Sequence, residues 1–287
     1  MNPHTTVIPP AILAEHLDDP RWVIIDCRFD LKDVQAGERE YARGHIPGAH
    51  YAHLDRDLSG DKTGANGRHP LPDPDAAATR FGRFGVEPGV QVVAYDQDTG
   101  MLAARCWWLL RYLGHDAAAV LDGGYARWTS EGRPSTSDVP LDASGDFQAS
   151  PRPAMLVDAS EVERVVHEGS ARLIDARAPE RYRGDVEPLD AVAGHIPGAV
   201  NHFFKHNLDD RHRFLDPAAL KSRLSAALAG ATSEQSIAYC GSGVTACHNL
   251  LALEIAGLHG AKLYAGSWSE WSAAPERPVE RSTPGGS

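Results

Sequence analysis

Short runs of apolar, β-branched and aromatic residues alternate with helical patterns in the first half of the chain. Strands are predicted at residues 22–26 (WVIID) and 90–95 (VQVVAY), and a third strand with its turn at 117–124 (AAAVLDGG). Helices are predicted at 10–17 (PAILAEHL) and 100–113 (GMLAARCWWLLRYL). Strands that alternate with helices pair in parallel, so this pattern predicts an α/β domain, a parallel sheet with helices on both faces.

The second half of the chain repeats the first. Four blocks recur in the same order, separated by 143 to 150 residues. The matching blocks are 22–28 and 172–177, 42–51 and 192–201, 92–110 and 236–254, and 121–128 and 264–271. This spacing indicates a tandem duplication of one domain. We predict an N-terminal domain over 1–140, a Pro- and Ser-bearing linker over 141–154 and a C-terminal domain over 155–287.

Composition limits the class of protein. The 287 residues are 42% hydrophobic and 23% charged, which is ordinary for a globular chain of about two domains. The net charge of −11 disfavours nucleic acid as a partner, because phosphates attract clustered Lys and Arg. No apolar run approaches the roughly 20 residues of a membrane span, and no signal peptide is visible. We therefore expect a cytoplasmic protein with no membrane partner.

The four cysteines form no CxxC pair and no His/Cys cluster with zinc spacing, so neither a metal site nor a disulfide framework is predicted. No cofactor is expected. Cys27, at a strand end, is expected to be inert, and Cys106 is expected to pack in a helix core. Cys247, on the first turns of a helix, is expected to be buried, with a second redox thiol as the alternative.

The fourth cysteine occupies a different kind of position. In AYCGSGVTACHN (238–249), Cys240 follows a predicted strand that ends at Tyr239. Open parallel sheets bind ligands at the carboxyl ends of their strands. The matching stretch of the first half, AYDQDTGMLAAR (94–105), has Asp96 at this position. We therefore predict that the C-terminal domain carries a nucleophile and that the N-terminal domain is a catalytically inert copy.

The residues after Cys240 are suited to stabilise a thiolate. Gly241 and Gly243 allow the backbone to wrap tightly, and such a turn can direct successive N–H groups inward as an anion-binding nest. A helix is predicted over about 246–256 with Thr245 as its N-cap, and its N-terminus adds unsatisfied N–H groups and a positive dipole end. The alternative interpretation is a packed turn without chemistry.

Two other classes of cysteine enzyme fit this loop less well. A cysteine phosphatase needs an arginine six positions after the cysteine to hold phosphate bidentately, and this chain has Ala246 there. A cysteine protease needs a histidine as general base. The sequence alone does not place a histidine beside Cys240.

With its repeat and its loop, the chain resembles the two-domain sulfurtransferases of the rhodanese family. The loop CGSGVTA (240–246) is similar to that of members that use 3-mercaptopyruvate. Members that use thiosulfate carry basic residues where this chain has Gly241 and Ser242. The resemblance covers nearly the whole chain, including both GHIPGA blocks, the Asp96 copy and GSWSEW (266–271).

The resemblance implies a ping-pong transfer of sulfur through a Cys240 persulfide. The implied donor is the small anion 3-mercaptopyruvate, with thiosulfate, or both donors, as the alternative. The implied acceptor is cyanide, a small thiol or a thioredoxin-like protein thiol. Arg181 matches the family arginine that binds the donor's carboxylate or sulfonate, and Arg177 and Arg183 are weaker candidates. The loop residues implied to bind the donor are Gly241, Ser242, Gly243, Val244 and Thr245.

Two residues of the first half are implied to join the site. The segment 57–72 matches one that faces the active loop in the family. Within it, Asp57 and His69 match an aspartate and a histidine proposed to form a proton relay with the loop serine, here Ser242. Histidine is suited to proton transfer near neutral pH.

One departure from the family pattern bears on the donor. Members that use mercaptopyruvate usually have a second arginine before the second GHIPG block, where this chain has Leu189 and Asp190. The resemblance therefore leaves both donors open. A sulfur carrier or sensor that accepts sulfur without turnover is a further function that the same fold could have.

Overall fold

The computed structural model describes residues 3–282, which form two compact units. The first unit comprises the chain up to Gly60, Leu71–Arg152 and Asp210–Phe214. The second comprises Asp61–Pro70, Pro153–Asp209 and the chain from Leu215 onward. The short segment Asp61–Pro70 therefore belongs to the second unit, although its sequence neighbours on both sides belong to the first.

The first unit is a five-stranded parallel sheet with the spatial order β1-β5-β4-β2-β3. Its strands are β1 (Val7–Ile8), β2 (Trp22–Asp26), β3 (Ala49–Tyr51), β4 (Gln91–Tyr95) and β5 (Ala118–Leu121). Its helices are α1 (Pro10–Ala14), α2 (Ala36–Arg43), α3 (Pro74–Arg83), α4 (Ala103–Tyr112) and α5 (Gly124–Ser130). The helix predicted over 10–17 is shorter than expected, and residues 15–18 continue as turns before Pro20, whose ring disfavours helical backbone at the preceding residue.

The second unit repeats this topology as β6-β10-β9-β7-β8, again with all pairs parallel. Its strands are β6 (Leu156–Val157), β7 (Arg172–Asp175), β8 (Val200–Asn201), β9 (Ser236–Tyr239) and β10 (Lys262–Tyr264). Its α-helices are α6 (Ala159–Glu168), α7 (Pro179–Arg183), α8 (Pro217–Leu228), α9 (Thr245–Ile255) and α10 (Ser267–Trp271). Three short 3₁₀ helices are η1 (Pro153–Met155), η2 (Phe204–Asn207) and η3 (Ser233–Gln235).

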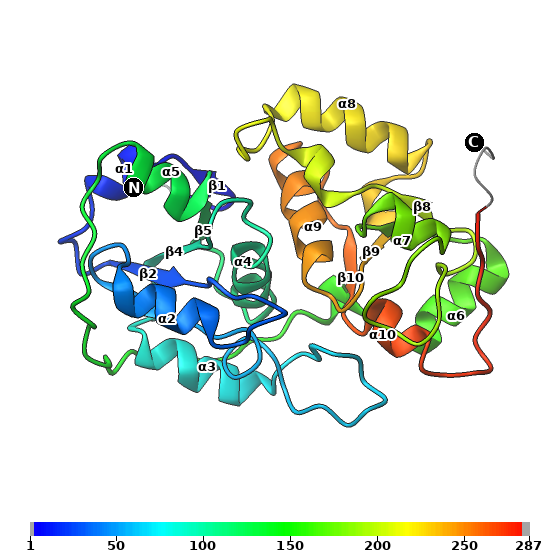
Figure 1. The fold of residues 1–287 in the computed structure, drawn as a ribbon, viewed down its shortest axis with the longest axis horizontal. Coiled ribbons are helices and arrows are strands. Elements are labelled where there is room, and N and C mark those ends of the chain that lie inside the picture. The colour runs from blue at the N-terminus through cyan, green and yellow to red at the C-terminus, as the bar shows by residue number, and fades with distance from the viewer. Residues whose placement is uncertain (1–2, 283–287) are drawn as a thin grey trace. The chain divides into compact units, whose positions relative to one another are not determined.

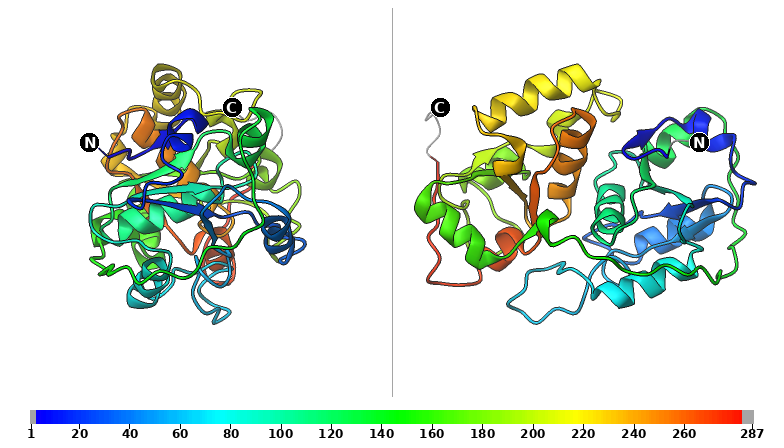
Figure 2. Two further views of the ribbon diagram at one scale, coloured as in Figure 1. Left: turned by 90° about the vertical axis from the view of Figure 1, so that its left-hand side faces the viewer. Right: turned by 180° about the vertical axis from the view of Figure 1, so that it is seen from behind.

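Helices cover both faces of each sheet, which confirms the predicted α/β fold class. In the second unit, α8 packs on α9, and α9 packs on β9 and β10. Helices α6 and α10 lie on the opposite side of those strands (Figure 1), and the view from behind shows the same two layers (Figure 2). No helix within residues 3–282 is long and apolar enough to cross a membrane.

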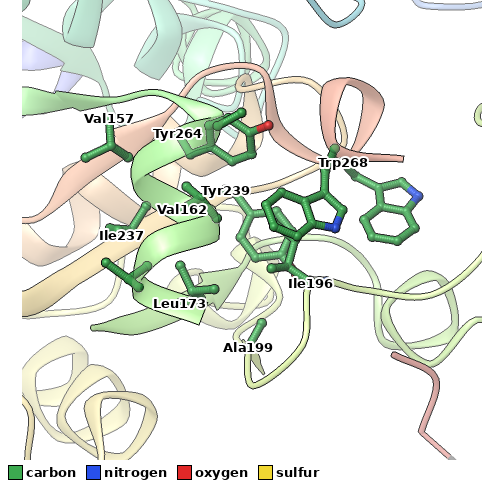
Figure 3. Close-up of a cluster of buried hydrophobic side chains, with 12 residues drawn as sticks. Val157, Val162, Leu173, Ile196, Ala199, Ile237, Tyr239, Tyr264 and Trp268 are labelled. Carbon is green, nitrogen blue, oxygen red and sulfur yellow. Dashed lines mark hydrogen bonds between the residues drawn. The ribbon is translucent and has the colours of Figure 1, made fainter. Parts of the chain in front are cut away.

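One core cluster of the second unit packs between its sheet and helices α6 and α10. Figure 3 shows Val162 of α6 and Trp268 of α10 packed around Leu173, Ile237 and Tyr239 of the central strands. Burial of such large apolar side chains is the main stabilising term for this layer. The consequence for the site is that α10 is firmly anchored beside the carboxyl end of β9.

Both GHIPGA blocks contain turns, and each is tied to a central strand. The N–H of Ile46 donates to the hydroxyl oxygen of Tyr95 at the end of β4, at 3.2 Å. In the second unit the N–H of Ile196 donates to Tyr239 at the end of β9, also at 3.2 Å. The internal repeat therefore extends to individual hydrogen bonds.

Several histidines are buried and held neutral. Burial lowers the pKa of His115 and His195, and of His202, below the ordinary value of about 6.5 because it disfavours the charged imidazolium. His202 also lies 2.9 Å from the side-chain oxygen of Asn207 through its Nε2 atom. On unfolding these imidazoles reach water and take up protons more readily.

The protein should lose stability as pH falls from 7.5 to 5.5. The unfolded state binds more protons than the folded state in this window, so each buried histidine contributes a slope of at most about 1.4 kcal/mol per pH unit to the free energy of unfolding. Urea unfolding of His202→Gln across this range should show a shallower slope. His167→Gln, at an exposed histidine, is the control, and equal flattening in both variants would show that burial is not the cause.

Candidate functional site

The candidate site is the loop that joins β9 to α9. Cys240 is the first residue after β9, at the carboxyl edge of the sheet, and it is 2% exposed. Helix α10 fixes the start of the loop. The N–H of Cys240 donates to Oγ of Ser267 at 3.1 Å, and its carbonyl accepts from the N–H of Trp268 at 3.0 Å. The carbonyl of Gly241 accepts from the N–H of Ser269 at 2.9 Å, so three contacts set the path of the backbone around the cysteine.

The turn itself depends on Gly243. Its φ of +75° lies in the left-handed region, and a Cβ at this position would lie 2.4 Å from the carbonyl oxygen of Ala265. Glycine has no Cβ, so it can adopt this positive φ and also avoid the contact with Ala265. The prediction that Thr245 is the N-cap is wrong: Thr245 is the first helical residue, and the cap is Val244, whose side chain makes no cap hydrogen bond. The tight turn at Gly243 brings the chain into the helix one residue earlier than the capping pattern suggests.

The equivalent loop of the first unit shows what this backbone can hold. There the carboxylate of Asp96 accepts four backbone hydrogen bonds. The N–H groups of Gly100 and Leu102 donate at 2.9 and 2.8 Å, and those of Asp98 and Ala103 at 3.2 and 3.3 Å. Burial raises the pKa of Asp96, and the backbone N–H groups oppose the rise because they stabilise the charged form. The loop is therefore an anion-binding nest whose anion is a side chain of the same chain.

In the second unit one of the four corresponding donors, the N–H of Cys247, bonds to the carbonyl of Val244 at 3.1 Å, and the other three differ. Ser242, Val244 and Ala246 align with Asp98, Gly100 and Leu102. Within residues 3–282, no protein acceptor contacts the backbone N–H groups of these three residues. Buried N–H groups without an acceptor are unfavourable, and they lie at the N-terminus of α9, where the helix dipole adds positive potential. This loop can therefore hold a negatively charged group that the chain itself does not supply.

The structure brings His69 to the loop. Its Nδ1 atom lies 2.7 Å from Oγ of Ser242, as the predicted relay requires. A hydrogen bond ties the segment Asp61–Pro70 to α10: the backbone N–H of Arg68 donates to the side-chain Oγ of Ser269 at 3.0 Å. His69 and Ser242 both belong to the second unit, so their hydrogen bond forms within that unit.

Asp57 lies in the first unit. Its carboxylate accepts from the N–H of His53 at 2.7 Å and pairs with Nε of Arg80 at 3.1 Å. The part of Asp57 in the relay stays a prediction.

Two guanidinium groups lie beside Gly241. A Cβ at Gly241 would lie 2.9 Å from Nη2 of Arg68, and 3.3 and 3.5 Å from Nη1 and Nη2 of Arg181. Arg181, predicted to bind the donor, lies beside the loop, and its binding role stays a prediction. Arg68 was not predicted, although it directly precedes His69 in the sequence, and that adjacency was the signal available. Arg68 gives the site a second guanidinium group. The sequence has Leu189 and Asp190 at the place where family members that use mercaptopyruvate usually have a second arginine.

Carboxylates hold both of these guanidinium groups. Arg181 donates to Glu187 through Nε at 3.2 Å and through Nη2 at 2.6 Å, and its Nη2 lies 3.5 Å from Asp190. Arg68 pairs with the other oxygen of Asp190. Arginines 68 and 181 together with Glu187 and Asp190 carry no net charge.

The weaker arginine candidates do not contact the loop in this way. Arg177 is buried, pairs with Asp175 at 2.6 Å and stacks over Trp268, which is a structural role. Arg183 pairs with Asp185 at 2.7 Å on the exposed side of α7.

The remaining cysteines are buried, as predicted. Burial raises the pKa of Cys27 well above its ordinary value, which disfavours the reactive thiolate. The Sγ atom of Cys247 donates to the carbonyl of Gly243 at 3.3 Å. Within residues 3–282, no group of three or more His, Cys, Asp or Glu side chains is arranged to hold a metal ion.

A cysteine at the carboxyl edge of a parallel sheet, followed by a nest of backbone donors, forms a place where a small anionic group can bind. The chain belongs to the rhodanese family, since the rhodanese-like domain matches residues 9–131 and again residues 158–274. The two matches confirm the predicted family and the predicted tandem fold.

Relatives of similar length carry sulfurtransferase names. A probable 3-mercaptopyruvate sulfurtransferase of Pseudomonas aeruginosa is 49% identical over 269 residues, which is 93% of this chain and 95% of the relative. A protein of Mycobacterium tuberculosis, provisionally named a thiosulfate sulfurtransferase, is 39% identical over 268 residues, or 91% of each chain. The crystal structure of the Escherichia coli 3-mercaptopyruvate sulfotransferase matches with a TM-score of 0.81 at 32% identity, covering 92% of this chain and 99% of that one. These likenesses confirm the predicted enzyme class, a sulfurtransferase.

Gly243→Ala should destabilise the protein more than Gly198→Ala does. Both glycines have a φ of +75°, but a Cβ at Gly198 meets no atom within 4 Å. Gly198→Ala therefore carries only the left-handed strain of about 1–2 kcal/mol, and overpacking at Gly243 adds about 1–3 kcal/mol. Urea unfolding measures both free energies. Equal losses in the two variants would mean that the contact with Ala265 does not constrain the loop.

Proposed function

We propose that this chain transfers sulfur from 3-mercaptopyruvate to cyanide, a small thiol or a thioredoxin-like protein thiol through a persulfide on Cys240. The observation that carries the proposal is the difference between the two loops. The same turn binds the Asp96 carboxylate in one unit and begins with Cys240 in the other, where three donors have no acceptor among residues 3–282. A persulfide anion on Cys240 is the acceptor that these donors would stabilise.

The first half-reaction moves one sulfur atom from the donor to the enzyme. The Cys240 thiolate attacks the donor's thiol sulfur and forms an S–S bond. The bond between that sulfur and carbon 3 of mercaptopyruvate breaks, and its electron pair stays on the carbon. Pyruvate leaves as an enolate, which a proton then converts to pyruvate. Arg181 binds the donor's carboxylate, and the backbone donors of the loop offset the charge on sulfur as it develops.

The proton for the enolate comes from the relay. The 2.7 Å contact between His69 and Ser242 supports a path from the imidazole through the serine hydroxyl. Asp57 is the proposed third member of the relay, on its match to the family aspartate.

The second half-reaction returns the enzyme to its starting state. The acceptor's thiolate, or cyanide, attacks the outer sulfur of the persulfide, the S–S bond breaks, and its electron pair regenerates the Cys240 thiolate. The product is a persulfide of the acceptor, or thiocyanate.

Thiosulfate is the second candidate donor, alone or together with mercaptopyruvate. Two observations favour including it: the name of the Mycobacterium tuberculosis relative, and the two guanidinium groups beside Gly241, which suit a sulfonate as well as a carboxylate. The loop residue Ser242, which is uncharged, favours mercaptopyruvate. Comparison of kcat/KM for the two donors decides between them.

Incubation with mercaptopyruvate or thiosulfate should add the mass of one sulfur atom to the protein, and cyanide should remove it. Cys240→Ser should neither gain that mass nor turn over, because the nucleophile is lost. Cys247→Ser, at a buried cysteine whose hydrogen bond a serine can keep, should still be loaded. Intact-protein mass spectrometry measures both, and activity retained in Cys240→Ser would overturn the proposal. Loading without repeated turnover would instead indicate a sulfur carrier.

The relay predicts a donor-dependent effect of His69→Gln. With mercaptopyruvate the variant should lose about a hundredfold or more in kcat, because a carbanion-like leaving group must be protonated. With thiosulfate the leaving group is sulfite, which needs no proton on carbon, so the loss should stay below tenfold. Ser242→Ala should show the same contrast. Equal losses with both donors would show that His69 only supports the loop.

A further inference from the structure

The carboxylate of Asp190 lies between the two guanidinium groups of the candidate site. One of its oxygens pairs with Nη1 of Arg68, and the other lies 3.5 Å from Nη2 of Arg181. The Asp190 side chain is 8% exposed, so the contact is not a solvated surface pair. A carboxylate bridged by two guanidinium groups has the chemistry expected of a bound α-keto acid.

This bridge is located next to the nucleophile. Both guanidinium groups lie within 3.5 Å of the position that a Cβ on Gly241 would occupy, and Gly241 follows Cys240 directly. A donor whose carboxylate took the place of the Asp190 carboxylate would have its neighbouring atoms close to the start of the loop. The loop 240–246 contains no Lys or Arg, and Arg68 and Arg181 bring positive charge to Gly241 from outside it.

The two carboxylates at the site are held differently. Glu187 is 3% exposed and binds Arg181 through two bonds and Arg177 through a third. Asp190 lies in the stretch 185–193, which contains neither helix nor strand, and its neighbour Leu189 is 46% exposed. Asp190 is therefore the carboxylate that can withdraw while Glu187 keeps Arg181 in place.

From this geometry we infer that Asp190 is an internal competitor for the donor: its carboxylate occupies the subsite, formed by Arg68 and Arg181, that takes the carboxylate of an α-keto acid donor. The inference rests on the proposed function for the identity of that donor. With Asp190 in place the four charges of the site cancel. When Asp190 withdraws, one net positive charge remains, which matches a monoanionic carboxylate. Asp190 thus weakens binding of every anionic donor, and Arg68 is the second arm of the subsite.

Pyruvate binding tests this without any sulfur transfer. The affinity of the full chain for pyruvate is measured by isothermal titration calorimetry for wild type, Asp190→Asn, Asp190→Ala and Arg68→Gln. Removing a competing carboxylate from a charge-assisted pair should tighten pyruvate binding about tenfold in both Asp190 variants. Arg68→Gln should weaken it about tenfold. The control Asp185→Asn removes one negative charge from the same stretch. The Asp185 side chain is 38% exposed, so this variant should leave the affinity within twofold of wild type.

Several outcomes would overturn the inference. Unchanged or weaker pyruvate binding in both Asp190 variants would mean that Asp190 positions the arginines and does not compete. An equal gain in Asp185→Asn would mean that net charge alone is responsible. Thermal unfolding of each variant verifies that it is folded. Sulfur loading of wild-type protein by mercaptopyruvate is measured separately, so a protein that is never loaded but binds pyruvate more tightly without Asp190 contradicts the proposed function and keeps the inference.

Discussion

The site depends on one constraint: the turn after strand β9 directs backbone N–H groups to a place where the described part of the chain offers them no acceptor. Gly243 allows this turn through its positive φ, and α10 fixes the backbone of Cys240 and Gly241. Buried donors of this kind are stabilised by an anion. Cys240 lies at the edge of that nest, where the proposed persulfide would be within reach of the backbone donors.

The duplicated architecture provides an internal control for this interpretation. Both units tie a GHIPGA turn to the central strand through a tyrosine hydroxyl, and both place the same turn after that strand. In the first unit the Asp96 side chain occupies the nest through four hydrogen bonds, so its donors are satisfied within the fold. The same turn therefore forms with either an aspartate or a cysteine at this position. The two units differ here by the exchange of a carboxylate for a thiol, which is the difference on which the proposed function rests.

Much of this could be predicted from sequence because it is local or repeated. Alternating strands and helices gave the parallel sheets, and the repeat placed Cys240 at the end of a strand. The contact between His69 and Ser242 was accessible only through resemblance to the rhodanese family, since the two residues are 173 positions apart. Arg68 was missed for the same physical reason: its place beside Gly241 depends on a segment that packs on the second unit, which no local pattern encodes. The N-cap was wrong because turn geometry at Gly243 determines where α9 begins, and side-chain preference at Thr245 does not.

The charged side chains beside the nest determine how strongly the site attracts an anion. Two guanidinium groups are held by two carboxylates, so the free site attracts anions weakly for its number of arginines. The overall charge of −11 acts in the same direction. In the proposed reaction, donor recognition is therefore a competition among carboxylates, whereas the transferred sulfur is stabilised by the backbone.

A crystal structure of the sulfur-loaded protein tests the central claim most directly. The account predicts a persulfide on Cys240 whose outer sulfur lies within hydrogen-bond distance of the backbone nitrogens of Ser242, Val244 and Ala246. An outer sulfur that contacts only the guanidinium groups of Arg68 or Arg181, or a persulfide on another cysteine, would contradict it.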